Sequence, residues 1–406
     1  MSMLKGNVLF IVNMDPNNKT GLFNATHQRI KAIKPHLSEF DIYCLKYYDS
    51  FFLSVLKKLF KKETNQKEEM FFDYEGIRYK NLYIKNGILR KILFAIGIDL
   101  PSFLKYMIVN RKKIKRYNLI SAHWGYPQGN LSYYIYKFFG VPYVITFHGS
   151  DIHTVPKQNK VIKKFTLKIL EKAANNFFVS KGLQKEAKAL GYNKENYSIL
   201  PNGIDTSRFP SLAMEEVNRI KSELMIEGKV VGYVGNLVEV KGVNKLPEIF
   251  RIINSSFSDK VNFLIVGQGS MFESLKNNFE QNNINVYFTG KVNPEDVSMY
   301  MNILDVLILP SKNEGWGNVI LEAHACGTIA IGSNVGGIPE AIGDHSLVVE
   351  NDAEFEEKVA KKVVEKLEQG YEPHLLIERV NREFAVQVMV DKELCKYKEI
   401  LKKEEM

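Results

Sequence analysis

Residues 309–340 read LPSKNEGWGNVILEAHACGTIAIGSNVGGIPE, and the order of strand, turn and helix in this stretch decides the fold. The apolar run Val306–Leu309 has the length of a buried strand, and Pro310 ends it. Gly315 and Gly317 then predict a tight turn, because glycine accepts backbone conformations that other residues avoid. A buried strand that leads through a glycine turn into a helix is typical of a parallel α/β sheet.

A short helix is predicted over Val319–Cys326. Asn318 stands where an N-cap belongs, and Gly327 is placed to end the helix in a left-handed conformation. Glu314 lies in the turn before this helix, and Glu322 lies about one turn inside it. Backbone N–H groups and the helix dipole suit a phosphate at such an N-terminus, and the two carboxylates suit sugar hydroxyls. These groups outline a pocket for a nucleotide sugar.

The two glutamates are separated by seven residues, and glycine-rich turns flank them in a known order. The stretch resembles the E-x7-E motif of the retaining GT-B glycosyltransferases of family 4, with the turn Gly315-Trp316-Gly317-Asn318 before the helix and Gly336-Gly337-Ile338-Pro339-Glu340 after it. The alternative, two solvated glutamates on a helix surface, does not explain the glycines crowded against the first one. The resemblance implies an α/β GT-B fold, in which two Rossmann-like, doubly wound parallel-sheet domains face each other across a cleft that holds the active site.

The composition is that of a globular chain with two or three domains of about 150 residues each. Its 406 residues are 45% hydrophobic and 25% charged. The three cysteines, Cys44, Cys326 and Cys395, are far apart and odd in number, which predicts a reducing compartment and no disulfide framework or metal site. The run Val8–Val12 indicates a first strand rather than a signal peptide. No apolar run approaches the about 18 residues of a membrane span, and Ile92–Ile98 is too short.

The net charge of +9 is divided unequally along the chain. Residues 1–200 contain 33 Lys and Arg against 14 Asp and Glu, a balance of +19, whereas residues 201–406 contain 22 against 32, a balance of −10. Such a division predicts an anionic partner for the first half. No nucleic-acid-binding module is recognised, so no nucleic acid is expected, and an anionic membrane surface is the better candidate.

Two basic clusters in the first half could make that contact. Apolar residues from Phe52 to Phe60 recur at helical spacing on one face, and the second cluster is Arg111–Arg116. The other side of the first helix carries Lys57, Lys58, Lys61 and Lys62. Two ordinary surface helices remain the alternative. Peripheral contact with the inner face of the cell membrane, by an otherwise cytoplasmic protein, is therefore a hypothesis.

The first half opens in a Rossmann-like manner. A strand over Val8–Val12 is followed by a polar loop and a helix over Leu22–Lys34, so the loop lies at the carboxyl end of the strand, where open α/β sheets bind ligands. The family resemblance implies that the backbone of Gly21 approaches the donor phosphate. It also implies that His148, directly after the strand Tyr143–Phe147, faces the donor sugar as a catalytic residue.

The acceptor side has two candidates in the same half, His123 and Asp151. Asp151 could orient the acceptor hydroxyl, and His123 could line the acceptor side. Capping or packing explains both residues equally well.

The second half restarts with a strand over Val230–Val234, a loop and a helix. In the family an arginine commonly stands where this chain has Asn236, and it clamps the donor diphosphate together with a lysine that matches Lys241. Asn236 brings no charge to that clamp. Lys291 and Val292 are similar to the loop on which family members seat the nucleotide base.

The resemblance also assigns roles to the two glutamates. Glu322 would bind the ribose hydroxyls, and Glu314 the hydroxyls of the donor sugar close to its anomeric carbon, so the catalytic set is Glu314, His148 and Lys241. The remaining donor-binding residues come from the turn and the helix N-terminus: Trp316, Gly317, Asn318 and Val319.

We therefore predict an acceptor-side domain over residues 1–204, a nucleotide-sugar-binding domain over 205–385, and a final helix over 386–406 that crosses back to the first domain. A sugar would move from an NDP-sugar, with UDP as the expected nucleotide, to a glycan or lipid-linked acceptor in polysaccharide or glycolipid biosynthesis, with retention of configuration. No metal is required if lysine and backbone donors neutralise the diphosphate, and no cofactor is expected. A GT-B-fold epimerase or phosphorylase, and a catalytically silent scaffold subunit, stay open as alternatives. The sequence names neither the sugar nor the acceptor.

Overall fold

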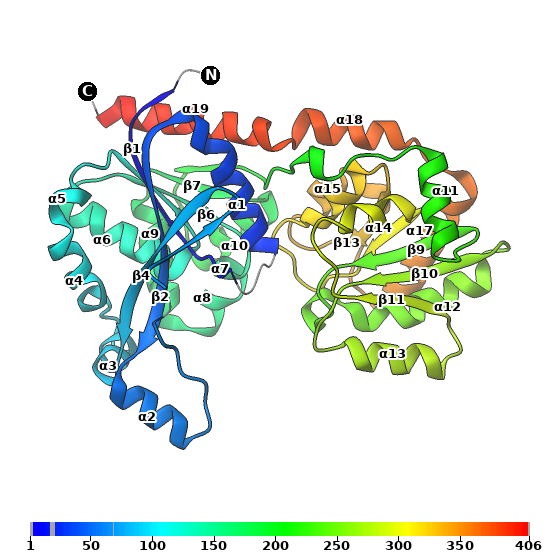
Figure 1. The fold of residues 1–406 in the computed structure, drawn as a ribbon, viewed down its shortest axis with the longest axis horizontal. Helices are drawn as coiled ribbons and strands as arrows, with labels where there is room; N and C mark the ends of the chain where they lie inside the picture. The colour runs from blue at the N-terminus through cyan, green and yellow to red at the C-terminus, as the bar shows by residue number, and fades with distance from the viewer. Residues whose placement is uncertain (1–2, 17–20, 68, 405–406) are drawn as a thin grey trace. The chain divides into compact units, whose positions relative to one another are not determined.

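The computed structural model describes residues 3–16, 21–67 and 69–404 (Figure 1). These residues form two compact units, one comprising residues 1–201 and 389–406 and the other residues 202–388. Each unit is built on one sheet covered by helices. The predicted polar loop after the first strand falls partly on residues 17–20, which lie outside the described residues.

The first unit contains an eight-stranded sheet in the order β3-β4-β2-β1-β5-β6-β7-β8. All neighbouring strands are parallel except β3 and β4. The central strand β1 is fully buried over Val8–Val12, which explains its unbroken apolar run. The strands are β1 (Leu4–Val12), β2 (Leu37–Asp49), β3 (Phe71–Tyr74), β4 (Ile77–Asn86), β5 (Leu119–His123), β6 (Tyr143–Phe147), β7 (Asn175–Phe178) and β8 (Tyr197–Ile199).

Helices surround this sheet and supply the outer layers of the unit (Figure 1). They are α1 (Gly21–Ile33), α2 (Phe51–Leu59), α3 (Ile88–Ala95), α4 (Leu100–Val109), α5 (Arg111–Ile114), α6 (Asn130–Phe139), α7 (Ser150–His153), α8 (Val155–Gln158), α9 (Lys160–Lys172), α10 (Lys181–Leu190) and α19 (Val386–Glu404). Among the described residues no single helix has the length and apolarity of a membrane span. The pair α3 and α4 passes that test together but is bent by 119°.

The second unit contains a six-stranded, all-parallel sheet in the order β11-β10-β9-β12-β13-β14. The strands are β9 (Lys229–Val234), β10 (Val261–Val266), β11 (Val286–Gly290), β12 (Val306–Leu309), β13 (Ile329–Ser333) and β14 (Val348–Val349). The helices are α11 (Met214–Glu223), α12 (Leu246–Ser256), α13 (Phe272–Gln281), α14 (Val297–Ile303), α15 (Asn318–Ala325), α16 (Ile338–Ile342), α17 (Phe355–Gln369) and α18 (Pro373–Glu383). The predicted fold class, two doubly wound parallel-sheet α/β units, is confirmed.

Strand order fixes where each sheet can bind a ligand. The order reverses between β1 and β5 in the first unit and between β9 and β12 in the second. In open α/β sheets the crevice lies outside the carboxyl ends of the strands at such a reversal. The loops that follow these four strands are therefore the candidate ligand loops.

One edge of the first sheet was not predicted. β3 and β4 form an antiparallel hairpin, and its turn residues Glu75 and Gly76 have φ angles of 44° and 74°. Two positive φ angles are the mark of a two-residue hairpin turn whose twist matches that of the strands. The pair Glu75-Gly76 between two alternating apolar runs was the available signal.

The final helix is tied to the first unit by buried polar contacts. Arg29 of α1 donates to the Glu393 carboxylate at 2.5 Å, and both side chains are almost fully buried. The Tyr397 hydroxyl contacts the Ser121 hydroxyl of β5 at 2.8 Å. A helix held by a buried ion pair and a buried hydrogen bond is a fixed part of the unit's core, since breaking either leaves an uncompensated polar group.

Candidate functional site

The turn between β12 and α15 is the centre of the second unit's ligand end. Gly317 has a φ of 95° and is the N-cap of α15, so Asn318 is the first helical residue; the prediction that Asn318 is the cap is wrong by one position. The left-handed conformation at Gly317 requires glycine, which moves the helix start one residue on. Asn318 instead accepts a hydrogen bond from the Asn202 amide at 3.3 Å. Gly327, with a φ of 86°, ends the helix as predicted.

The second glycine pair is pressed against this turn. A Cβ added to Gly336 would lie 1.6 Å from the carbonyl oxygen of Glu314, and one added to Gly337 would lie 2.8 Å from the Cα of Trp316. No side chain fits at such distances. The loop after β13 therefore supports the turn that carries Glu314, which gives a steric reason for the Gly336-Gly337 pair.

Lys241 and Glu314 form an ion pair at the strand-order reversal. The Lys241 ammonium lies 2.5 Å from the Glu314 carboxylate, and the two side chains are 27% and 15% exposed. Lys241 follows β9 and Glu314 follows β12, so the two neighbouring strands bring together residues 73 positions apart. At Gly242 an added Cβ would lie 1.9 Å from the carbonyl oxygen of Pro310, so the two loops are packed backbone to backbone.

Glu322 lies one turn inside α15, and among the described residues its carboxylate forms no ion pair. Burial raises the pKa of its carboxyl to about 7, and the charge of Arg208 opposes that rise. A carboxyl with a pKa near 7 in the first turns of a helix can accept hydrogen bonds from the hydroxyls of a ligand. These hydrogen bonds would offset the loss of hydration of its charged form.

The other predicted donor residues are placed less centrally. Asn236 is exposed and its carbonyl accepts from the Tyr233 hydroxyl at 2.9 Å. Lys291 is exposed after β11, and Val292 beside it is half-buried. Within the described part of the chain, neither Asn236 nor Lys291 has a side-chain hydrogen bond or ion pair with the Lys241–Glu314 pair. Trp316 is buried against Phe384, and no described residue accepts a hydrogen bond from its indole N–H. Val319 in the first turn of α15 is half-buried.

In the first unit the structure brings His123 and His148 together. His123 ends β5 and His148 follows β6, and the His123 Nδ1 lies 3.2 Å from the His148 Nε2. Burial lowers the pKa of His148 to about 3 and lowers that of His123 well below its ordinary value. Both rings are therefore neutral near pH 7. Within residues 3–16, 21–67 and 69–404, His148 Nδ1 and His123 Nε2 have no hydrogen-bond partner, so each ring keeps a polar atom available.

Asp151 holds the loop that carries His148. Its carboxylate accepts from the backbone N–H groups of His148 at 3.1 Å, Gly149 at 2.9 Å and Gly125 at 3.1 Å. Burial raises the pKa of Asp151 to about 6, and these hydrogen bonds oppose that rise. The arrangement favours the capping role among the two that were open.

Arg29 is a neighbour of the two histidines that the sequence analysis did not identify. Its charge further lowers the pKa of both His123 and His148, after burial as the main cause. Its Nη1 and Nη2 are buried and find no hydrogen-bond partner in the part of the chain that the structure describes. A single arginine in an amphipathic helix gives no sequence signal of burial. Gly21, the predicted phosphate contact, is the exposed first residue of the same helix, with open space around it.

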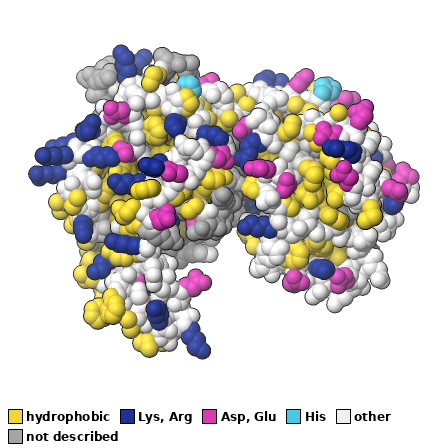
Figure 2. All heavy atoms as spheres, viewed as in Figure 1, with side chains coloured by type: hydrophobic (Ala, Val, Ile, Leu, Met, Phe, Trp, Pro, Cys, Tyr) yellow, Lys and Arg dark blue, Asp and Glu magenta, His cyan; other side chains and the backbone are white. Residues whose placement is uncertain are grey.

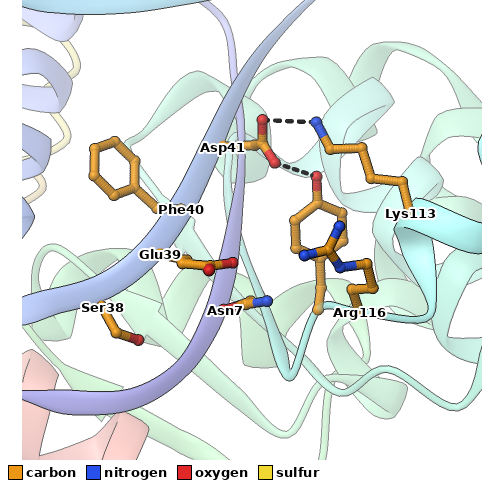
Figure 3. A pocket seen from close by; sticks show the side chains of 8 residues that line it. Asn7, Ser38, Glu39, Phe40, Asp41, Lys113 and Arg116 are labelled. Carbon is orange, nitrogen blue, oxygen red and sulfur yellow. Dashed lines mark hydrogen bonds and ion pairs between the residues drawn. The ribbon is translucent and has the colours of Figure 1, made fainter.

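The first unit also has a hollow away from these residues. A cavity of about 410 Å³ opens near the amino ends of β1 and β2, lined by Asn7, Ser38, Glu39, Phe40, Asp41, Lys113, Arg116 and Tyr117 (Figure 3). Asp41 accepts from the Lys113 ammonium at 2.8 Å and from the Tyr117 hydroxyl at 2.6 Å. This cavity lies at the amino ends of the strands, whereas the two histidines lie at the carboxyl ends of β5 and β6. Part of the Arg111–Arg116 cluster is thus neutralised by Asp41 rather than free for a partner.

Two family models match the chain, Glycosyltransferase Family 4 over residues 73–208 and Glycosyl transferases group 1 over residues 214–379. TuaC of Bacillus subtilis (strain 168), named for teichuronic acid biosynthesis, is 33% identical over 230 residues, which are 56% of this chain. The chain spans 56% of the length of TuaC. CapM of Staphylococcus aureus, named for capsular polysaccharide biosynthesis, is 28% identical over 64% of this chain and 71% of its own length.

Among solved structures, HepE from Anabaena in complex with UDP and glucose has a TM-score of 0.70 at 16% identity, over 97% of this chain and 99% of its own. At that identity the likeness shows the fold alone. The two family models together match residues of both units. The chain therefore belongs to the GT-B glycosyltransferases of family 4.

Proposed function

We propose that this protein transfers a sugar from an NDP-sugar, with UDP as the nucleotide, to a glycan or lipid-linked acceptor with retention of anomeric configuration. The observation that carries the proposal is the ligand end of the second unit. There the Lys241–Glu314 ion pair and the N-terminus of α15 lie at the strand-order reversal. Gly242 and Gly336 let the backbones of neighbouring loops pack in direct contact. Polysaccharide biosynthesis is the proposed setting, because relatives named for it are similar in sequence to part of this chain.

In this proposal Lys241 leaves Glu314 when the donor binds and neutralises the diphosphate. The backbone N–H groups of Gly317 and Asn318 contribute at the helix N-terminus. Removing charge from the leaving group in a water-poor site is a large contribution to glycosyl transfer. Because lysine and backbone donors supply that neutralisation, the proposed reaction needs no metal. Asn236 supplies a hydrogen bond where a second cation would act, so Asn236→Arg should be tolerated and should tighten diphosphate binding.

The bond changes follow from these contacts. The bond between the anomeric carbon and the leaving phosphate oxygen breaks, and a bond to the acceptor oxygen forms on the same face. The acceptor proton passes to the leaving phosphate oxygen. Glu314 is proposed to bind hydroxyls of the donor sugar, Glu322 those of the ribose, and neutral His148 the sugar through its unpartnered Nδ1.

A thermal-shift screen with nucleoside diphosphates and their sugars tests this proposal. A ligand that binds only the folded protein raises its melting temperature by mass action. UDP and UDP-sugars are expected to stabilise the native protein and to have a much smaller effect on Glu322→Ala. No shift with any nucleotide, in protein that melts cooperatively, would contradict the proposed donor class. A further test is release of free UDP when acceptor is added, which a silent scaffold would not show.

A further inference from the structure

The first unit exposes an unusually large set of apolar side chains on one group of helices. On α2, Phe51 and Phe52 are 77% and 76% exposed, and on α3 Leu89 is 69% exposed. Figure 2 shows hydrophobic side chains gathered toward the end of this unit that carries α2 and α3. The complete set is Phe51, Phe52, Val55, Leu56, Leu59, Phe60, Ile88, Leu89, Ile92, Ile96, Ile98, Leu104, Ile108 and Val109. Exposed apolar surface on this scale marks an interaction site.

These residues belong to one surface. The N-cap of α2, Ser50, donates its backbone N–H to the carbonyl of Asn86 at 2.8 Å, and Gly87, the N-cap of α3, lies against the Ser50 side chain. The two helices thus begin side by side at the ends of β2 and β4. We call α2 together with α3 and α4 the docking surface. On its inner side α4 buries Phe103, so only the outer face is available.

Charge identifies what this surface fits. Residues 51–62 contain four lysines and no acidic residue, and residues 88–116 contain eight Lys and Arg and one acidic residue, Asp99, which is buried. Lys57 is paired with Asp49 at 2.7 Å, whereas Lys58, Lys61, Lys62, Lys91 and Lys105 are exposed. An apolar face bordered by lysines is the pattern that binds an anionic lipid surface, where apolar side chains enter the interface and cations meet the headgroups.

The inner side of α3 is bonded to the loop that follows β5. The Arg90 guanidinium donates to the hydroxyls of Tyr47 and Tyr126, each at 2.9 Å, and lies 3.4 Å from the Asp99 carboxylate. The Tyr126 hydroxyl in turn donates to Asp99 at 3.0 Å. The ring of Phe94 lies 5.5 Å from the Tyr126 ring. The docking surface and this loop are therefore one hydrogen-bonded and packed group.

The same loop borders the histidine pair. It starts with Trp124, one residue after His123, and Trp124 has a φ of 93°, a conformation that costs energy for a residue with a side chain. Its next residue, Gly125, donates to Asp151, which also holds the backbone of His148. A continuous chain of contacts thus runs from the docking surface to His123 and His148, all within the first unit.

We propose that α2, α3 and α4 dock on an anionic lipid bilayer, and that Arg90 and Phe94 transmit docking to the loop 124–129 beside the histidine pair. The inference rests on the proposed function for the purpose of that loop, which is to present a lipid-linked acceptor. Docking would change the loop because α3 shifts when its outer face enters the bilayer. The contacts of Arg90 and Phe94 with Tyr126 on the inner face of α3 would then shift with it. Trp124 holds the strained backbone of this loop, so its conformation is the one that we expect docking to change.

Docking is tested by sedimentation with vesicles of phosphatidylcholine alone or of equal parts phosphatidylcholine and phosphatidylglycerol. The native protein is expected to pellet with the anionic vesicles and to be released by salt. The variant Leu89→Ser/Ile92→Ser/Ile96→Ser should bind at least about tenfold more weakly, because three inserted apolar side chains are lost. The matched control is Met214→Ser/Met225→Ser/Leu375→Ser, which changes three exposed apolar residues of the second unit and should bind like the native protein.

Transmission is tested by tryptophan emission, since the chain has two tryptophans and Trp316→Phe leaves only Trp124. Anionic vesicles are expected to shift the Trp124 emission. In Arg90→Gln and in Phe94→Leu the shift should be lost while vesicle binding remains. Phe94→Leu keeps the Arg90–Asp99 pair, so it gives the answer if Arg90→Gln fails to fold.

Several outcomes would overturn the inference. Equal pelleting of the native protein and the Leu89→Ser/Ile92→Ser/Ile96→Ser variant would refute docking through this surface. A native dimer that the triple variant converts to monomer, with no pelleting of either, assigns the surface to a second copy of the chain. If the Trp124 emission stays unchanged when the protein binds vesicles, the proposed transmission from α3 to the loop is refuted. Neither readout requires sugar transfer, so failure of the proposed function would show separately, as absence of nucleotide binding in protein that still docks.

Discussion

Replacing Glu322 by glutamine should stabilise the nucleotide-free protein at high pH and not at low pH. The half-buried Glu322 carboxyl has a pKa of about 7 in the folded protein, against 4.5 for an ordinary glutamate. Between these values the folded state binds more protons than the unfolded state, so the free energy of unfolding falls as pH rises. Above pH 7 the full cost is present. It amounts to about 3 kcal/mol, from about 1.4 kcal/mol for each pKa unit.

The expected curves separate in a specific pH range. Well below pH 4.5, native protein and Glu322→Gln should unfold at similar denaturant concentrations, since the glutamate is then neutral in both the folded and the unfolded state. From pH 4.5 to 7 the native protein should lose stability relative to the variant, and above pH 7 the difference should stay constant. The measurement is the free energy of unfolding of the second unit at a series of pH values. The control is Glu295→Gln, an exposed glutamate of the same unit.

A bound nucleotide should reverse this behaviour. Ribose hydroxyls that donate to the Glu322 carboxylate favour its charged form, so the affinity for UDP should rise as pH rises through 7. In Glu322→Gln that dependence should be absent. Parallel stability curves for native protein and variant would refute the burial argument. Unchanged UDP affinity in Glu322→Ala, measured by calorimetry, would refute the ribose assignment.

Three other changes have clear expectations. Lys241→Ala should lower turnover by about 10²–10³ through loss of leaving-group neutralisation, while Lys241→Arg keeps more activity; equal UDP release by all three proteins would disprove the clamp. Gly336→Ala should destabilise the second unit by about 4 kcal/mol or more because of its clash with Glu314, whereas Gly140→Ala in the first unit, at a left-handed glycine with no atom within 4 Å of the added Cβ, should cost about 1 kcal/mol; chemical denaturation of each unit compares them. Asp151→Ala leaves three backbone N–H groups unpaired and should destabilise the first unit without changing UDP affinity in calorimetry; a large loss of affinity would contradict the proposal that residues of the second unit bind UDP.

The strands that are buried on both faces of a sheet were the elements most readily predicted from the sequence. Val8–Val12, Val230–Val234 and Val306–Leu309 were predicted as strands, and all are strands in the structure, because parallel sheets covered on both faces need unbroken apolar runs. The helix end at Gly327 was predicted for a similar local reason. The N-cap was misplaced because the left-handed backbone of Gly317 depends on the loop packed against it.

Long-range contacts were not predictable from one sequence. Nothing local in Arg29 indicates that it pairs with Glu393, 364 residues away, or that its charge acts on the histidines. The pairing of Lys241 with Glu314 depends on β9 lying beside β12, which only the strand order reveals. By contrast, the backbone-capping role of Asp151 is a local pattern, since it lies two and three residues from two of the N–H groups it binds.

On the proposed function, the Lys241–Glu314 pair explains how a charged donor site can stay folded before its ligand arrives. A lone lysine and a lone carboxylate in a partly dry loop end would each lose hydration without compensation, and together they compensate each other. A donor diphosphate carries more negative charge than one carboxylate, so it competes for Lys241. Once Lys241 turns to the diphosphate, Glu314 has lost its cation and gains most from donating hydroxyls, which the donor sugar supplies. Glu314 stays in place during this exchange, because Gly336 packs against its backbone and only its side chain has to change partners. On the proposed function, the pair therefore makes capture of the diphosphate and capture of the sugar a single linked event.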